Sequence, residues 1–289
     1  MRRIKSFAKI NLGLEIIRKR EDEYHDIRTI FQAIDFYDVL EFRTIREKKV
    51  LLDGKNQSVS WDESNLIFKA ATLLKERFNL SQGIEIWVDK NIPPGKGLGG
   101  GSSNAAMTLY ALNIIWELHL EKKDLMDLGS KLGADVPFFL EGGLCLGLGR
   151  GDEVTPLHDL NSLPCILVLP SFSISTASVY DRFPLSLTSD DKESKIIKFL
   201  EHREFDLLEN NLEETIFSIY PQLKAIKSLF RSQGSELSLV SGTGSAVFGL
   251  FLEKERAERI LKELKKSYEA LIVETLSRKR YWKNLNVGV

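Results

Sequence analysis

The stretch PPGKGLGGGSSNAAMTLYALNIIW, from Pro93 to Trp116, places a glycine-rich loop directly before a long apolar helix pattern. Glycine raises the entropy cost of folding, so such a loop needs a structural reason. Its backbone N–H groups can converge on phosphate oxygens, and the start of a helix adds unsatisfied N–H groups with a partial positive charge. The hydroxyls of Ser102 and Ser103 can contact a phosphate or Mg²⁺. The stretch therefore favours a phosphate-binding loop over a flexible connector or a packing turn.

Two common phosphate-binding loops match this stretch poorly. Gly95, Gly97 and Gly100 satisfy G-x-G-x-x-G, but this motif alone is a weak signal. A dinucleotide loop leaves its strand directly, within the first βα unit, whereas residues 91–94 here separate strand from loop. The acidic residue about twenty positions on, Glu117, falls on the expected helix. No Gly-Lys-Ser/Thr closes the run, so the loop is not a Walker loop.

The composition is that of an ordinary globular protein. The 289 residues suffice for two packed domains or one large one, and 40 Lys and Arg against 41 Asp and Glu leave no global basic field for nucleic acid. Cys145 and Cys165 lie in apolar stretches without metal-ligand spacing, which predicts buried thiols in a reducing compartment. The sequence has neither a signal-peptide pattern nor a run of about 18 apolar residues. We expect a cytoplasmic protein without a nucleic-acid or membrane partner.

The periodicity predicts an α+β protein in two halves, because strands and helices alternate without a strict βαβ rhythm. The expected strands are 7–16, 35–42, 83–88, 165–169 and 270–275, with a hairpin-like pair around residues 241–245. The expected helices are 65–78, about 103–118, 122–132 with Gly133 as C-cap, two between 170 and 212, 213–230 and 254–266. The turn-rich segment 142–164 predicts a boundary between domains 1–158 and 159–289. The basic run SRKRYWK, 277–283, is expected to be only a solvated terminal segment.

Several polar residues outside the loop have two interpretations. Asp135 precedes Val-Pro-Phe-Phe, so it is a helix N-cap or a catalytic base. Lys9 is a surface lysine on a strand or a partner for such a carboxylate, and Asn11 shares its strand face by period two. Tyr24 and His25 suit packing or a nucleobase site.

Two further polar groups are equally open. Ser241-Gly242-Thr243-Gly244 is a hairpin turn or part of a binding site. Asn65 is an N-cap or a contact to a ligand.

Three motifs in order carry a family resemblance. Residues 94–103 resemble the phosphate loop of the GHMP kinases, such as galactokinase, homoserine kinase and mevalonate kinase. The motifs AKINL (8–12) and SGTGS (241–245) also resemble that superfamily. GADVPFF (133–139) and REDEYHDIRTIFQAID (20–35) resemble the members that act on a cytidine diphosphate-linked methylerythritol in the non-mevalonate isoprenoid route. The motifs span residues 8–245.

The resemblance implies the two-domain GHMP kinase fold, with a ribosomal-protein-S5-domain-2-like ATP-binding domain followed by a ferredoxin-like domain. It implies transfer of the γ-phosphoryl of ATP, with Mg²⁺, to the 2-hydroxyl of the erythritol, in a cleft between the halves. Asp135 would be the base and Lys9 its partner. The implied ATP contacts are Asn65, Pro94, Gly95, Lys96, Gly97, Leu98, Gly99, Gly100, Gly101, Ser102 and Ser103. The implied substrate contacts are Asn11, Tyr24, His25, Thr176, Tyr180, Gly242 and Thr243.

Some details stay open at this point. No dedicated carboxylate ligand for Mg²⁺ is evident, so Ser102 or Ser103, the phosphates and water would hold it. Glu23 stands where the family usually has glycine, so a turn that needs a positive φ would be strained. A monomer or weak homodimer is expected. Alternatives are a GHMP kinase for another alcohol such as homoserine or mevalonate, a Rossmann-type oxidoreductase, and a non-catalytic metabolite-binding relative.

Overall fold

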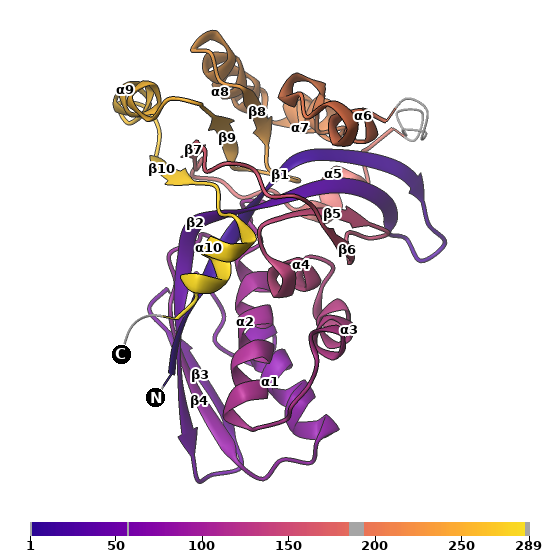
Figure 1. Ribbon diagram of the computed structural model, residues 1–289, viewed down its shortest axis with the longest axis vertical. Helices are drawn as coiled ribbons and strands as arrows, with labels where there is room; N and C mark the ends of the chain where they lie inside the picture. The colour runs from indigo at the N-terminus through magenta and orange to yellow at the C-terminus, as the bar shows by residue number, and fades with distance from the viewer. Residues whose placement is uncertain (1, 57, 185–193, 287–289) are drawn as a thin grey trace.

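The computed structural model describes residues 2–56, 58–184 and 194–286, which form two β-sheets with helices packed on them (Figure 1). The first sheet has the order β3-β4-β2-β5-β6, with β1 paired to β2, and the second has the order β10-β7-β9-β8. Neighbouring strands are antiparallel, except that β3 and β4 are parallel. The strands of the first sheet are β1 (Arg2–Lys19), β2 (His25–Ile45), β3 (Val50–Gly54), β4 (Gly83–Asp89), β5 (Leu144–Leu148) and β6 (Glu153–Pro156). Those of the second are β7 (Pro164–Val168), β8 (Leu237–Val240), β9 (Val247–Leu250) and β10 (Ala270–Glu274).

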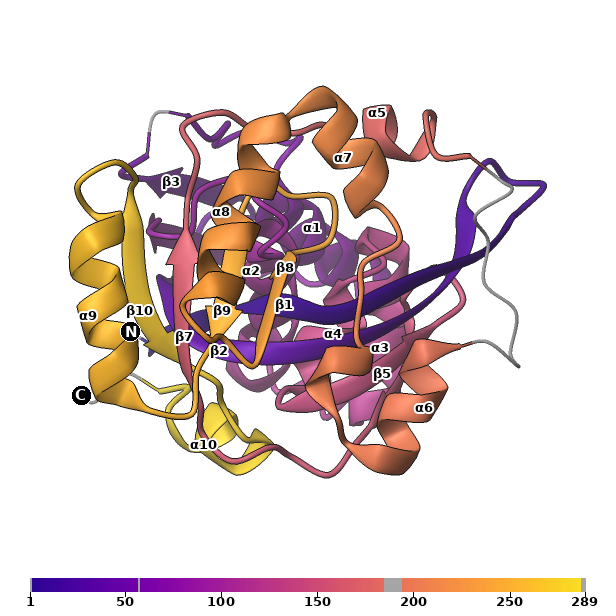
Figure 2. The same cartoon turned by 90° about the horizontal axis from the view of Figure 1, so that it is seen from above.

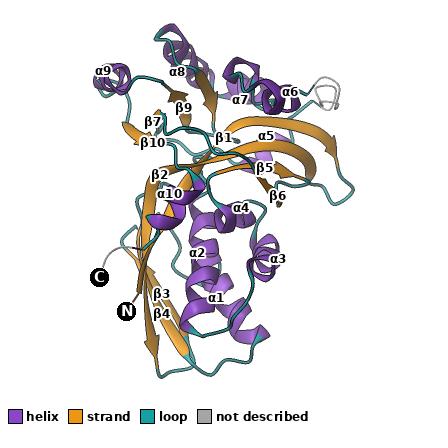
Figure 3. Cartoon of the chain, viewed as in Figure 1, coloured by secondary structure: helices purple, strands orange, loops and turns teal. Residues whose placement is uncertain are grey.

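The helices fall into two groups (Figure 3). Those beside the first sheet are α1 (Leu66–Arg77), α2 (Gly100–Ile115), α3 (Lys122–Leu132), α4 (Val136–Glu141) and α10 (Arg278–Lys283). The remaining helical elements lie on the opposite side of the β1–β2 hairpin: α5 (Thr176–Tyr180), α6 (Lys195–His202), the 3-10 turn η2 (Phe205–Leu207), α7 (Glu213–Ile219), α8 (Pro221–Ser232) and α9 (Lys254–Leu264). Of these, α6 contacts β1 and β2. Seen from above, α8 and α9 lie over the second sheet, α8 against β8 and β9 and α9 against β7 and β10 (Figure 2). No helix of the described residues has the length and apolar character required to cross a bilayer.

The long β1–β2 hairpin lies between the helices of the first sheet and the strands of the second sheet. Both of its faces are therefore buried. Alternate residues of a strand face opposite sides. Phe7 belongs to the core beneath α1 and α2, whereas Ala8, Ile10 and Leu12 belong to the core that contains β7 and β9. The polar residues Lys9 and Asn11 therefore lie on the helix side of a fully covered strand, where they are almost completely buried.

The architecture confirms the α+β prediction, with several local corrections. The helix predicted over 213–230 is wrong as a single helix: α7 and α8 are separated at Tyr220, because Pro221 has no N–H and its ring clashes with the preceding turn. Helix α2 begins at Gly100 rather than near residue 103, so the last two glycines form its first turn. The turn-rich segment 142–164 contains the strands β5 and β6, which periodicity missed, as it missed β3. The division at residue 158 stays a prediction.

The basic run at 277–283 is not a solvated segment, so that prediction is wrong. It forms α10, whose N-cap Ser277 accepts a hydrogen bond from the N–H of Arg280. Tyr281 is fully buried and donates its hydroxyl to the carbonyl of Phe139 at 2.7 Å. Trp282 donates its indole N–H to the carbonyl of Glu141 at 2.9 Å. The two aromatic side chains of this charged segment, Tyr281 and Trp282, therefore pack on α4.

We predict that Tyr281→Ala lowers the free energy of unfolding by about 3–5 kcal/mol, the range for removing a large buried aromatic side chain. A denaturant titration measures the change. Lys283→Ala is the matched control, because Lys283 is exposed on the same helix. Equal stabilities of the two variants would contradict the packing role of α10.

Candidate active site

One cavity of about 1070 Å³ collects almost all of the predicted site residues. Its walls come from β1, the tip of the β1–β2 hairpin, the glycine loop, α5 and the loop between β8 and β9. Its volume is at the upper end for ligand pockets. The predicted residues that line it are Lys9, Asn11, Tyr24, His25, Asn65, Pro94 to Ser102, Asp135, Thr176, Tyr180, Gly242 and Thr243. Among the predicted residues, Ser103 alone does not line it.

The glycine loop is held between β1 and the loop that follows β8. The N–H of Lys9 donates to the carbonyl of Leu98 at 3.0 Å, and the hydroxyl of Ser241 donates to the carbonyl of Gly97 at 2.8 Å. A Cβ on Gly97 would lie 1.9 Å from the carbonyl oxygen of Ser241, and Gly97 has a φ of 72°. Only glycine fits there, which supplies the structural reason for one costly residue of the loop.

The start of α2 lies at the same wall of the cavity. Its N-cap is Gly99, which has no side chain to accept a hydrogen bond. The first N–H groups of a helix have no acceptor inside it, and they carry the positive end of the helix dipole. Gly100, Gly101 and Ser102 thus present backbone donors where the cavity begins, an arrangement suited to phosphate oxygens.

Lys9 and Asp135 form an ion pair in the cavity. Lys9 Nζ lies 3.6 Å from Asp135 Oδ2, and the side chains are 4% and 32% exposed. Lys9 also donates to Asn11 Oδ1, while Asn11 Nδ2 donates to the hydroxyl of Thr29 at 2.8 Å. Burial lowers the pKa of Lys9, and the charge of Asp135 opposes that shift. Asp135 stands at the N-cap position of α4 but makes no side-chain capping bond, so its carboxylate is available to a substrate.

The aromatic residues form a second region of the cavity wall. The rings of His25 and Tyr180 lie with centroids 5.1 Å apart and planes inclined by 34°. Tyr24 is 56% exposed, and the guanidinium of Arg150 lies 5.3 Å from its ring centroid. Burial lowers the pKa of His25 below its usual value. At neutral pH its imidazole is therefore uncharged, with one nitrogen to donate and one to accept a hydrogen bond.

Glu23, which stands where the family usually has glycine, adopts a positive φ. Its φ is 66°, in the region that non-glycine residues rarely occupy. Its carboxylate pairs with Lys19 at 2.6 Å across the hairpin end. The turn therefore does require a positive φ, and this chain tolerates glutamate there.

The loop between β8 and β9 closes the cavity from the second sheet. The hydroxyls of Thr176 and Thr243 lie 3.1 Å apart, so the two predicted threonines meet. The side-chain amide of Asn210 donates to the carbonyls of Val240 at 3.0 Å and Gly242 at 2.7 Å. Asn210 thereby holds the loop in place from outside the cavity.

Three predicted ATP contacts have their side chains engaged within the protein. Lys96 donates to the carbonyls of Pro170 and Phe172 at 2.5 and 2.6 Å. The hydroxyl of Ser103 accepts a bond from Ser6 at 2.7 Å. Asn65 caps α1 by accepting from the N–H of Ile67 at 2.9 Å. Side-chain contacts from these three residues to ATP stay predictions. Such contacts would require the side chains to give up the hydrogen bonds described above.

The sequence interpretation missed several residues of the cavity wall. Arg150 lies in the turn-rich segment 142–164, for which the sequence predicts a domain boundary and no site residue, and Asp181 follows α5 directly. Lys90 precedes the glycine loop and pairs with fully buried Asp38 at 2.6 Å. A charged residue at the end of a strand, four residues before the Pro94-Gly95 start of the glycine loop, was the signal available for Lys90. Within the described part of the chain, no cluster of three or more His, Cys, Asp or Glu side chains is placed to hold a metal ion.

Comparisons with known proteins agree on one family. Residues 65–143 match the GHMP kinases N terminal domain, and residues 196–270 match the GHMP kinases C terminal model. The chain is 36% identical over 278 residues to 4-diphosphocytidyl-2-C-methyl-D-erythritol kinase of Caldicellulosiruptor bescii, covering 94% of this chain and 97% of that protein.

Solved structures extend this agreement to the fold. A crystal structure of 4-(cytidine 5'-diphospho)-2C-methyl-D-erythritol kinase matches with a TM-score of 0.81 and 32% identity, covering 94% of this chain and 98% of that one. Homoserine kinase from Cytophaga hutchinsonii matches with a TM-score of 0.76, covering 96% of this chain and 94% of that one. At 18% identity this match shows the shared fold alone. The chain has the GHMP kinase fold and belongs to the 4-diphosphocytidyl-2-C-methyl-D-erythritol kinase family within the GHMP kinases.

Proposed function

We propose that this kinase transfers the γ-phosphoryl group of ATP to the 2-hydroxyl of 4-diphosphocytidyl-2-C-methyl-D-erythritol. GHMP kinases take ATP as the phosphoryl donor, and the curated relatives bear the name of this reaction. The observation that carries the proposal for this chain is the Lys9–Asp135 pair, which shares one cavity with the glycine loop and with Tyr24, His25 and Tyr180. In such a reaction the carboxylate can serve as the base and the loop can hold the phosphates, while the aromatic rings can stack on a nucleobase.

Asp135 acts as the base in this proposal. A carboxylate accepts the proton of the attacking hydroxyl as the phosphoryl group is transferred. The neighbouring ammonium of Lys9 pairs with Asp135 at 3.6 Å and stabilises the charge that develops on the attacking oxygen. Asn11 accepts from the same ammonium, so it orients Lys9 towards the carboxylate. The backbone N–H groups at 97–102 hold the phosphates of ATP.

Mg²⁺ is part of the proposal, and Ser102 is the protein group that fits it. The Ser102 hydroxyl belongs to the first turn of α2 and lines the cavity, whereas the Ser103 hydroxyl is bound to Ser6. Mg²⁺ in kinases commonly takes few protein ligands and completes its shell with phosphate oxygens and water. Bound there, the ion would neutralise phosphate charge.

The aromatic wall supports a nucleobase substrate over a small aliphatic alcohol. Tyr24 offers an exposed ring face, and neutral His25 offers a donor and an acceptor to a base edge. Homoserine and mevalonate have no base to stack. We further propose a cytoplasmic enzyme, either a monomer or a weak homodimer, with domains at 1–158 and 159–289 and no nucleic-acid or membrane partner.

We predict that Tyr24→Ala raises KM for the cytidine substrate about 5- to 150-fold, because loss of base stacking costs roughly 1–3 kcal/mol. KM for ATP should change less than twofold. Steady-state kinetics with each substrate varied in turn measure both constants. Equal increases in the two KM values would contradict the stacking role.

A coupled ADP-release assay across candidate alcohols tests the proposed function. We expect rapid ADP release with 4-diphosphocytidyl-2-C-methyl-D-erythritol and background release with free methylerythritol, homoserine or mevalonate. Faster turnover of homoserine or mevalonate would replace the proposal with the alternative kinase.

A further inference from the structure

The tip of the β1–β2 hairpin is a turn held by its own side chains. The N–H of Arg20 donates to the carbonyl of Tyr24 at 2.8 Å, and the N–H of Tyr24 donates to Asp22 Oδ1 at 3.2 Å. An aspartate that accepts from the N–H two residues on forms an Asx turn, which fixes the intervening backbone. Here the intervening residue is Glu23, at a φ of 66°. Without a lock, a non-glycine residue at this position would favour another conformation.

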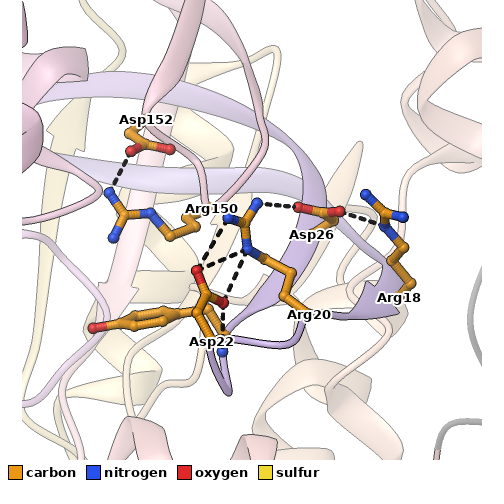
Figure 4. Close-up of polar contacts among 7 residues, drawn as sticks. Arg18, Arg20, Asp22, Asp26, Arg150 and Asp152 are labelled. Carbon is orange, nitrogen blue, oxygen red and sulfur yellow. Dashed lines mark hydrogen bonds and ion pairs between the residues drawn. The ribbon is translucent and has the colours of Figure 1, made fainter.

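Arg20 supplies that lock (Figure 4). Its Nε lies 3.0 Å from Asp22 Oδ1, its Nη2 lies 3.0 Å from Asp22 Oδ2, and its Nη1 lies 2.7 Å from Asp26 Oδ1. The guanidinium therefore binds the turn with one edge and strand β2 with the other. A planar fork of donors can do this, whereas a lysine ammonium cannot match both carboxylates in one geometry.

Tyr24 depends on this backbone support because little protein surrounds its side chain. It is more than half exposed, and its ring is approached by Arg150, which is itself anchored to Asp152 at 2.6 Å. An exposed ring binds a base well only if its position is set before binding, since ordering it on binding reduces the affinity.

We propose that Arg20 is a positioning residue for the cytidine end of the substrate: through Asp22 it holds the turn that aims Tyr24 into the cavity. The inference rests on the proposed function, because it concerns the ring that stacks on the base. Arg20 itself does not line the cavity. Its effect therefore passes through Tyr24 and spares ATP and the phosphoryl-transfer step.

A double-mutant cycle separates this role from a general structural one. Arg20→Ala should raise KM for 4-diphosphocytidyl-2-C-methyl-D-erythritol about tenfold, with kcat and KM for ATP within about twofold of wild type. Arg20→Ala combined with Tyr24→Ala should be no worse than Tyr24→Ala alone, because the two residues act as one unit.

Arg18→Ala is the matched control. Arg18 also binds Asp26, at 2.6 Å, but its side chain is 75% exposed, and neither its charge nor its contacts support the turn through Asp22. The KM of the Arg18→Ala enzyme for the cytidine substrate should equal that of wild type. Fold-changes that multiply in the double variant, or an equal rise in KM for ATP, would overturn the inference while wild type remains active. Absence of turnover by wild type would instead overturn the proposed function, and the inference with it.

Discussion

Asp135→Asn is expected to lower kcat by about 10³-fold or more, while the Kd for ATP changes less than twofold. The upper range for a positioned general base is about 10⁴-fold. Asparagine keeps the size and the N-cap position of Asp135, but it cannot accept the proton. ATP is expected to bind mainly through the glycine loop and α2, which the substitution leaves intact. Rapid-quench kinetics give the rate of phosphoryl transfer, and equilibrium dialysis gives the affinity for ATP.

The matched control is Asp127→Asn, on the exposed side of α3 and outside the cavity wall. It should retain the wild-type kcat. If Asp135→Asn kept more than a tenth of the wild-type rate, Asp135 would not be the base, and the Lys9–Asp135 pair would be an electrostatic feature of the cavity alone.

Lys9→Met is expected to lower kcat by about 10²- to 10³-fold, the scale of removing one group that stabilises developing charge. Methionine has a similar length and no charge, so the strand packing is retained while the attacking oxygen loses its cation. We expect little loss in the free energy of unfolding. Because burial lowers the pKa of Lys9, the fold already disfavours its charged form, and the substitution removes that cost together with the attraction to Asp135.

Lys5→Met is the matched control, because it tests whether the loss of kcat is specific to the lysine at position 9. Lys5 lies on β1 four residues earlier, with its ammonium 3.9 Å from the ring centroid of Tyr37, and it does not line the cavity. Its kcat should stay near that of wild type. A Lys9→Met enzyme with normal kcat and a raised KM would assign Lys9 to ground-state binding instead.

The sequence predicted the site best where a motif is compatible with few backbone conformations. The Pro94–Ser103 loop, with its positive-φ glycines and the helix that follows, leaves few options for a chain that must bring backbone N–H groups to an anion. Alternation placed Lys9 and Asn11 on one face, and the structure puts them in one cavity. The α+β class and most elements followed from periodicity in the same way.

The sequence did not predict side-chain contacts that depend on the exact start of a helix or on a partner far away in the chain. Helix termini cannot be located to the residue, and successive residues of a helix differ by about 100° in direction. Ser102 therefore lines the cavity while Ser103 binds Ser6 in the interior. A phosphate contact from Lys96 stays a prediction, and nothing in the sequence indicated that two carbonyls some 75 residues later in the chain accept hydrogen bonds from its ammonium. The packing of α10 likewise depends on α4, a partner that the local charges of 277–283 do not reveal.

The most direct test of the account is the chemical identity of the product. With ATP, Mg²⁺ and 4-diphosphocytidyl-2-C-methyl-D-erythritol, phosphorus NMR of the reaction should show one new phosphomonoester while the diphosphate signals of the substrate persist. Because C2 carries a methyl group and no hydrogen, a phosphate on the 2-oxygen should show no three-bond coupling to a proton, whereas a phosphate on the 1- or 3-oxygen would show one. A phosphomonoester on another oxygen, or ATP hydrolysis to free phosphate with the substrate unchanged, would contradict the assignment of this cavity to transfer onto the 2-hydroxyl.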